Sequence, residues 1–212
     1  MLNELEVLLH SSIRITAEKI VYVDPFRIDV AYHDADIILI THGHYDHFSP
    51  EDIAKTVKED TVIVIPEAMV EDAKALCRGD MSVVGVRPGQ TLTVCGVPIE
   101  TVAAYNIDKE FHPQRNAWVG YVITLNGMRY FIAGDTDLNA ENQKVICDVA
   151  LVPVGGTYTM DAKQAAELIN RIKPKFAVPT HYGSIVGKAS DAQAFMEFVD
   201  PPIRTVIRMA QQ

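Results

Sequence analysis

The 212-residue sequence has no apolar run long enough to cross a membrane, and no segment has the composition of a linker or a low-complexity tract. A membrane-spanning helix needs about 20 mostly apolar residues. The first fifteen residues, MLNELEVLLHSSIRI, also lack the basic start and long apolar stretch of a secretion signal. We therefore expect one folded domain over residues 1–212, located in the cytoplasm and without a membrane segment.

Cysteine and positive charge are also scarce. The three cysteines are far apart and no pair has C-x-x-C spacing, which argues against a disulfide framework and against a thiolate zinc site. Lys and Arg number 19 against 28 Asp and Glu, a formal net charge of -9. Nucleic-acid binding normally needs a clustered positive excess, so a small molecule is the expected partner. The sequence leaves a homo-oligomer open.

The pattern of apolar runs predicts a mixed α/β protein. Helices are expected after Ser49, over 66–76, from Asp161 and over 190–199, and a hairpin is expected around Asn126 and Gly127. The other expected strands are 5–9, 19–24, 36–41, 61–65, 82–86, 91–94, 97–104, 149–154 and 203–207, and the apolar segment FAVPTHYG spans 176–183. Three times, polar residues of catalytic type follow directly after an apolar strand, which is where sites in α/β proteins tend to collect.

Residues 41–47, THGHYDH, place three histidines and one aspartate after such a strand. In an extended segment, residues two apart point to one side, so His42 and His44 can bind one ion together, whereas Asp46 and His47 face another direction. Imidazole and carboxylate suit zinc, and also iron(II) or manganese. The motif predicts one or two divalent ions per chain; the alternative is a polar loop without metal.

Two later segments offer the further ligands that two ions would need. Asp135 in AGDT could bridge two ions, and His181 in PTHYG could complete the second. Two ions about 3.5 to 4 Å apart would hold a hydroxide between them and polarise the bond to be attacked. The alternative for Asp135 is an ordinary turn aspartate, and the alternative for His181 is a core or surface histidine without a metal.

These segments together resemble the metallo-β-lactamase superfamily. The resemblance is carried by THGHYDH, AGDT and VPTHYG, in this order, and covers nearly the whole chain. The stretches LLHSSIRI, YVDPF and VGGTYTM resemble the branch that includes ascorbate-6-phosphate lactonase and related metal-dependent hydrolases. The resemblance implies a four-layer αββα sandwich, with two mixed sheets face to face, helices outside, and the metal ions at one edge.

The resemblance also implies a set of metal ligands. They are His42 and His44 for the first ion, Asp46, His47 and His181 for the second, and Asp135 as the bridge. His10, in the HSS turn, matches a family position close to the site. The implied activity is hydrolysis of a small ester, lactone or phosphoester by a metal-bound hydroxide, with Asp46 and Asp135 as catalytic residues.

One position departs from the superfamily pattern. The first ion normally takes a third histidine after the middle sheet, and Asn106 in VAAYNID stands there. An amide oxygen is a much poorer ligand for zinc than imidazole. His112, six residues later, either supplies the missing nitrogen or is a loop residue that touches substrate or solvent.

The same loop provides the candidates for substrate binding, which are Asn106, Lys109, His112 and Arg115. A loop of about a dozen residues without periodicity is often functional. The three basic residues form a local cluster in an acidic chain, which predicts an anionic group on the substrate; a solvated loop is the alternative. Trp118, just after this loop, is expected in the core.

Three other functions remain open at this point. The chain could cleave phosphodiester bonds in nucleic acid, which its net charge argues against. It could sense a metal or ligand without catalysis, and Asn106 in a degenerate first site keeps this open. It could also be a scaffold without metal, in which case replacing His47 or Asp135 by alanine would change neither metal content nor stability.

Overall fold

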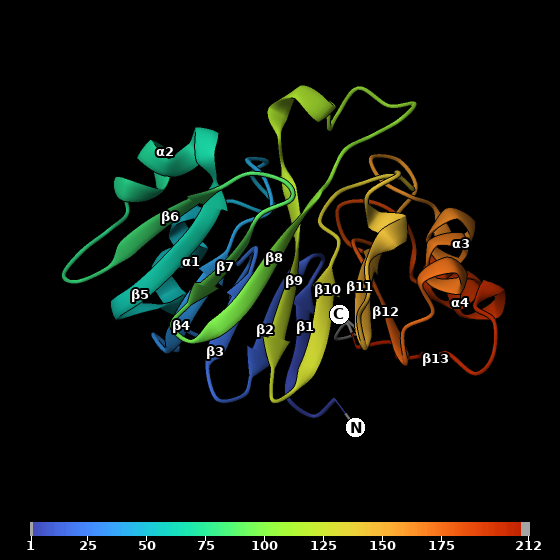
Figure 1. The fold of residues 1–212 in the computed structure, drawn as a ribbon, viewed down its shortest axis with the longest axis horizontal. Helices are drawn as coiled ribbons and strands as arrows, with labels where there is room; N and C mark the ends of the chain where they lie inside the picture. Colours follow the sequence, from blue (N-terminus) through green and yellow to red (C-terminus); the bar gives the residue numbers. More distant parts are fainter. Residues whose placement is uncertain (1, 209–212) are drawn as a thin grey trace.

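Two mixed β-sheets lie face to face in the computed structural model, which describes residues 2–208 (Figure 1). The first sheet contains, in spatial order, β1 (Leu5–Leu9), β2 (Ser12–Thr16), β3 (Ile20–Val23), β4 (Ala35–Leu39), β5 (Val57–Pro66) and β6 (Ser82–Val86). The second contains β13 (Arg204–Thr205), β12 (Phe176–Thr180), β11 (Val149–Pro153), β10 (Met128–Ile132), β9 (Val119–Leu125), β8 (Val97–Ala103) and β7 (Thr91–Val94).

Helices cover the outer faces of the sheets and complete four layers (Figure 1). Helices α1 (Pro50–Thr56) and α2 (Val70–Lys74) bury Ile53 and Ala73 against the first sheet. Helices α3 (Ala162–Ile172) and α4 (Ala189–Phe198) bury Leu168 and Phe195 against the second. A separate cluster of apolar side chains fills the space between the sheets. The structure therefore confirms the αββα sandwich.

Strand β4 shows why its sequence is almost continuously apolar. Ile37 and Leu39 point into the cluster between the sheets, whereas Ile38 and Ile40 point outward beneath α1 and α2. Successive side chains of a strand alternate between its two faces, so a strand covered on both sides needs apolar residues at every position. The motif at residues 41–47 follows this buried strand and is placed at the edge of the sandwich.

Two predicted helix starts and one predicted hairpin turn are confirmed. The side chain of Ser49 accepts a hydrogen bond from the Asp52 backbone at the start of α1, and Asp161 forms a capping box with Gln164 at the start of α3. In the hairpin, Asn126 and Gly127 have φ angles of 48° and 72°, as a two-residue turn requires.

Two elements differ from the sequence prediction. Strand β2 was not predicted, because its five residues SIRIT include the charged Arg14, whose guanidinium pairs with Asp34. The helix predicted at 66–76 is a single 3₁₀ turn (η1, Glu67–Met69) followed by the short α2. The three cysteines are free, as expected. Among the described residues, no helix combines the length and hydrophobicity needed to cross a membrane.

Candidate metal centre

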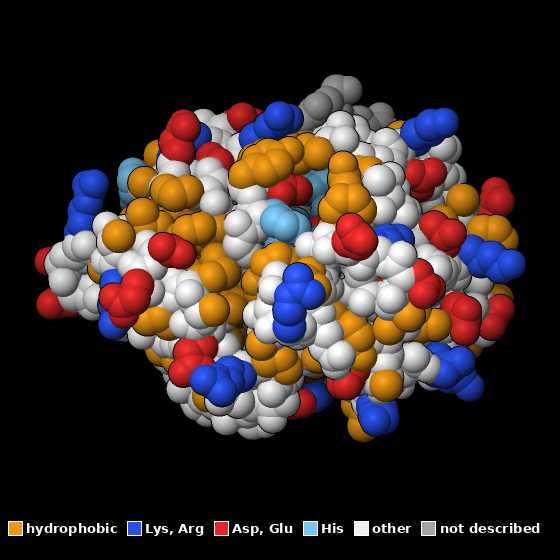
Figure 2. Space-filling view, turned by 90° about the horizontal axis from the view of Figure 1, so that it is seen from above, with side chains coloured by type: hydrophobic (Ala, Val, Ile, Leu, Met, Phe, Trp, Pro, Cys, Tyr) orange, Lys and Arg blue, Asp and Glu red, His pale blue; other side chains and the backbone are white. Residues whose placement is uncertain are grey.

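Six of the seven histidines meet at one edge of the sandwich, each in a segment that follows a strand. They are His10 after β1, His42, His44 and His47 after β4, His112 in the loop after β8, and His181 after β12. Asp46 follows β4, and Asp135 follows β10. Figure 2, which looks onto this edge, shows histidine and acidic side chains reaching the surface between hydrophobic side chains. The predicted ligands His42, His44, Asp46, His47, Asp135 and His181 thus lie together.

A buried carboxylate holds the motif loop in place. Asp24 accepts hydrogen bonds from the Thr41 backbone (2.8 Å) and hydroxyl (2.6 Å), and its Oδ2 lies 2.7 Å from Nδ1 of His47. This contact places the proton of His47 on Nδ1 and leaves Nε2 facing the centre. The sequence analysis did not single out Asp24. The available signal was its position directly after an apolar strand, the same position that the metal-binding candidates occupy.

The first ligand group consists of His42, His44 and His112. Nε2 of His42 lies 3.0 Å from Nδ1 of His44, and the ring of His112 lies 4.9 and 4.8 Å from these two rings. One nitrogen of each residue falls in a cluster narrow enough for a single ion. The spacing argument that grouped His42 with His44 agrees with this geometry, and His112 joins them from the other sheet.

The second ligand group consists of His10, Asp46, His47 and His181. Oδ2 of Asp46 lies 3.2 Å from Nε2 of His10, 3.7 Å from that of His47 and 3.9 Å from that of His181. The rings of His10 and His181 are also in contact, with centroids 3.8 Å apart and an angle of 41° between their planes. His10, which the family resemblance placed only near the site, thus lies within this group.

Asp135 lies between the two groups. Its Oδ2 is 3.0 Å from Nε2 of His181 and 3.3 Å from Nε2 of His112, and its Oδ1 is 3.4 Å from Nε2 of His47. A carboxylate in this position touches ligands of both groups. This is the arrangement that a bridging ligand needs.

Several atoms at the centre are buried without a hydrogen-bond partner. They are Nε2 of His10, His47, His112 and His181, and Oδ1 of Asp135. Leaving a buried polar atom unpaired costs about 1 to 3 kcal/mol, and such atoms are rare in native proteins. Inward-facing imidazole nitrogens around a carboxylate are the donor set that a divalent transition-metal ion prefers. The residues present therefore fit such an ion.

Burial and mutual charge shift the proton affinities of these groups in opposite directions. Burial lowers the pKa of His42 well below its usual value and lowers that of His10 to about 4. Burial opposes a charge on His47, but Asp135 and Asp24 outweigh it and raise the pKa of His47. Burial likewise opposes the charge on Asp135, but His181 and His47 hold the pKa of that carboxyl well below its usual range. Burial therefore favours the neutral form of His42 and His10, whereas the neighbouring carboxylates favour the charged form of His47.

Two of the ligand candidates have a left-handed backbone. His10 and His181 have φ angles of 58° and 57°, and the backbone N–H of His181 donates to the carbonyl of His10 at 2.9 Å. Such conformations cost about 1 to 3 kcal/mol for residues other than glycine and collect at functional sites. The two strand ends are thus joined at this point, one from each sheet.

The predicted substrate-binding cluster is corrected by the structure. The ammonium group of Lys109 pairs with the buried carboxylate of Asp137, and His112 is buried and faces Asp135. The amide of Asn106 bonds to His112 and to the carbonyl of Tyr158. Arg115 is exposed. These side chains point to different partners, because the loop folds around buried acidic and carbonyl groups, and they do not form one basic surface.

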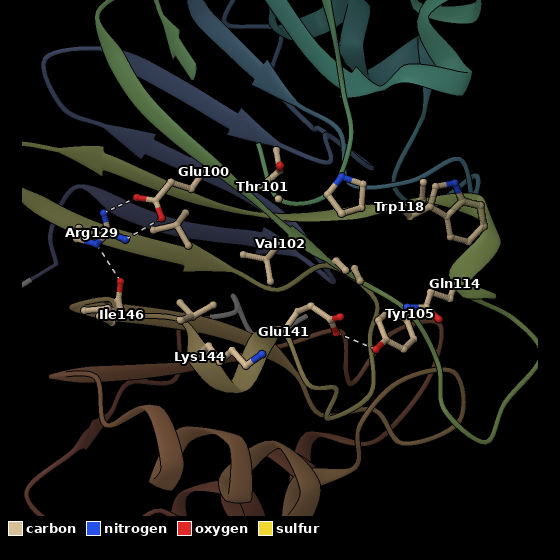
Figure 3. Close-up of a pocket in the computed structure, with 17 residues that line it drawn as sticks. Glu100, Thr101, Val102, Tyr105, Gln114, Trp118, Arg129, Glu141, Lys144 and Ile146 are labelled. Carbon is tan, nitrogen blue, oxygen red and sulfur yellow. Dashed lines mark hydrogen bonds and ion pairs between the residues drawn. The ribbon is translucent and has the colours of Figure 1, made fainter. Parts of the chain in front are cut away.

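A cavity of about 640 Å³ lies behind this loop, on the outer face of the second sheet (Figure 3). Val102, Tyr105, Trp118 and Lys144 are among the residues that line it. Trp118 is half-buried and also contacts the centre, with its ring 5.0 Å from that of His42. It therefore separates the cavity from the histidines instead of lying in the core as expected.

Comparison with known proteins decides the family. The sequence profile of the beta-lactamase superfamily domain matches residues 4–181. A metal-dependent hydrolase of the UPF0173 family from Thermococcus onnurineus is 31% identical over 93% of this chain and 92% of its own length. The chain is a metal-dependent hydrolase of the metallo-β-lactamase superfamily.

Other relatives of the hydrolase agree in fold. A UPF0173 metal-dependent hydrolase from Methanoregula boonei is 32% identical over 90% of this chain and 87% of its own. The crystal structure of a proposed metal-dependent hydrolase from Parabacteroides distasonis superposes with a TM-score of 0.81 at 33% identity, covering 98% of this chain and 93% of that chain. The family and fold that the motifs indicated are thereby confirmed.

Proposed function

We propose that this hydrolase uses two divalent ions, of which zinc suits the ligands best, to cleave a small ester, lactone or phosphoester. The observation that carries the proposal is the convergence of unpartnered, buried imidazole nitrogens on both sides of Asp135. His42 and His44 would hold the first ion, Asp46, His47 and His181 the second, and Asp135 would bridge them.

The side chains of this centre have two roles, which are to bind the ions and to transfer a proton. Bound ions supply an activated water molecule at neutral pH and stabilise the charge that develops on the attacked group. Asp46 is more accessible than Asp135, with 11% against 3% of its side chain exposed. Burial opposes its charge, but His10 and His47 outweigh this and lower the pKa of Asp46. An ionised Asp46 can accept the proton that the attacking water loses and return it to the leaving oxygen.

The opening of the centre supports a substrate with an apolar organic part. Tyr45, Ile107 and Phe111 are exposed, and Tyr45 and Phe111 directly adjoin site histidines in the sequence. The ring of Phe111 packs against that of Tyr158 at 4.6 Å. Since Lys109 is neutralised by Asp137, this side of the opening offers hydrophobic contact more than positive charge.

The proposal is tested on protein purified without chelator. Metal content is measured by mass spectrometry, and turnover is measured on p-nitrophenyl acetate, simple lactones and bis-p-nitrophenyl phosphate. We expect two ions per chain and turnover of at least one substrate class, lost in Asp135→Ala. Bound metal without turnover on any substrate would favour a sensor, and protein that binds no metal would contradict the proposal.

A further inference from the structure

The family resemblance predicts a third histidine where Asn106 stands, and the Asn106 side chain makes hydrogen bonds at both of its ends. Its Nδ2 donates to the carbonyl of Tyr158 at 2.9 Å. Its Oδ1 accepts from the backbone N–H of His112 at 3.0 Å and lies 3.1 Å from Nδ1 of His112. Because the carbonyl of Tyr158 can only accept, it fixes which end of the amide faces His112. The oxygen of Asn106 therefore points at the imidazole.

This contact determines the tautomer of His112. An amide oxygen has no proton to give, so Nδ1 of His112 must carry the hydrogen, and Nε2 keeps its lone pair. Nε2 is buried without a hydrogen-bond partner and lies 3.3 Å from Oδ2 of Asp135. The free lone pair is thus directed at the centre, next to His42 and His44.

The loop between these two residues is fixed to the segment that carries Asp135. The backbone N–H of Asn106 donates to the carbonyl of His112 at 2.8 Å and closes the loop. Asp137, two residues after Asp135, binds the backbone N–H of Ile107 and the ammonium group of Lys109. The position of His112 relative to Asp135 is therefore set by the fold and not by an exposed, unanchored loop.

We propose that His112 supplies the third nitrogen of the first ion and that Asn106 is the positioning residue that sets its tautomer and direction. The inference rests on the two-ion centre proposed above. Compared with the superfamily pattern, the ligand has moved six residues along the chain, and the original position now supports the new ligand. Oxygen partners on the outer nitrogen of a metal-binding histidine are a general device for orienting the ring.

Cobalt(II) binding tests the inference, measured by equilibrium dialysis and by the visible absorption of the bound ion. We expect two cobalt ions per wild-type chain and one in His112→Ala. Asn106→Leu should weaken one ion about 10- to 100-fold and leave the other nearly unchanged. Asn106→Asp, which keeps an acceptor for Nδ1, should remain within a few fold of wild type. Asn116→Leu, the same type of change on the same loop, is the control and should change neither ion.

Long-range ¹H–¹⁵N NMR of the imidazole rings in metal-free protein provides a second readout. We expect the Nδ1–H form of His112 in the wild type and a mixture of tautomers in Asn106→Leu. Two cobalt ions in folded His112→Ala, unchanged affinity in Asn106→Leu, or an Nε2–H form in the wild type would each overturn the inference. A wild-type chain that binds no cobalt would instead contradict the two-ion centre, and the tautomer measurement still tests the contact between Asn106 and His112.

Discussion

At the scale of single residues, the outer nitrogens of the site histidines are the main finding. Nδ1 of His47 faces Asp24, that of His112 faces Asn106, and that of His42 lies 3.0 Å from the hydroxyl of Thr41. Each oxygen partner leaves Nε2 of the same ring directed at the centre. The hydrolase therefore orients its ligands before any ion is bound, which reduces the cost of organising them on binding.

Replacing Asp135 tests the proposed ligand assignment. We expect Asp135→Ala to lose most of its bound metal, because one change removes a contact to both ligand groups. Metal content after dialysis against a metal buffer is the measurement. His33→Ala is the matched control, since His33 is the histidine outside the site and is exposed. Equal metal content in Asp135→Ala and wild type would contradict the assignment.

A second prediction concerns Asp24, which is buried and contacts Nδ1 of His47. In Asp24→Asn, the amide can donate to Nδ1 of His47 and so move the ring proton to the inward nitrogen. We expect zinc affinity to fall about 10- to 100-fold, measured by competition with a chromophoric chelator. Asp29→Asn, the same change at an exposed aspartate, should bind zinc as the wild type does. Unchanged affinity in Asp24→Asn would show that the contact with His47 does not support the ion.

At the residue scale, the sequence identified those metal-binding candidates whose residue type and spacing indicate metal binding. The H-x-H-x-D-H spacing indicated a cluster of metal-binding side chains, and Asp135 and His181 were found because each follows an apolar strand. Asp24 has the same position but stands alone. The role of Asn106 could not be seen, because it depends on a carbonyl 52 residues away, at Tyr158.

At the scale of secondary-structure elements, strand ends and their turns build the site. Strands were predictable because burial on one or both faces leaves a periodic pattern in the sequence. The loop after β8 was not, because its shape comes from contacts with Asp137 and Tyr158 and not from local preferences. A basic side chain in such a loop can pair with a carboxylate of the same protein and hold the loop in place, as Lys109 does with Asp137.

The turn after β11 gives an element-scale prediction. A Cβ at Gly155 would lie 2.3 Å from the carbonyl oxygen of His181, so Gly155→Ala must shift the backbone at His181 or at Gly155 itself. We expect this variant to bind one ion much more weakly while the group of His42 and His44 keeps its own. Cobalt stoichiometry is the measurement. Gly89→Ala is the control for backbone strain alone, because its φ of 81° strains an alanine but a Cβ there meets nothing within 4 Å. Full occupancy of both ions in Gly155→Ala would contradict the close approach.

The start of α1 gives a prediction about pH. Burial opposes the charge on Asp52, but hydrogen bonds from Ser49, from the Ile28 backbone and from Lys55 outweigh it and lower the pKa of Asp52. A carboxyl whose pKa is lower in the folded than in the unfolded state stabilises the fold above its unfolded pKa of about 3.9, and this contribution is lost as the pH falls through the folded pKa.

We therefore expect Asp52→Asn to lower the free energy of unfolding by about 1 to 2 kcal/mol at pH 7. The difference from the wild type should shrink toward pH 3, measured by urea denaturation of metal-free protein. Asp80→Asn, at an exposed aspartate, should differ little from the wild type at either pH. A difference for Asp52→Asn that stays constant with pH would show that its charge is not the stabilising feature.

At the scale of the whole molecule, the centre joins the two sheets. His10 and residues 41–47 follow strands of the first sheet, whereas His112, Asp135 and His181 follow strands of the second. An ion bound by both sets of ligands would cross-link the two halves of the sandwich. Binding to the folded chain alone stabilises it by mass action.

Metal removal should therefore lower the melting temperature. At an ion concentration about 100 times its Kd, binding contributes about 2.7 kcal/mol, and 1 kcal/mol shifts the melting temperature of a domain this size by about 2 to 4 °C. Since two such ions are expected, chelator should lower the Tm of the wild type by about 10 to 20 °C in differential scanning calorimetry. The Tm of Asp135→Ala should hardly respond. Equal shifts in both proteins would mean that the chelator acts elsewhere.

The most direct measurement for the central claim is a crystal structure of the zinc-loaded protein with anomalous difference density recorded at the zinc absorption edge. The account predicts two peaks about 3.5 to 4 Å apart, on either side of Asp135, with the first peak bound by His42, His44 and Nε2 of His112 and with Asn106 outside its ligand shell. A single peak, or a first ion bound by Asn106 with His112 turned away, would contradict it.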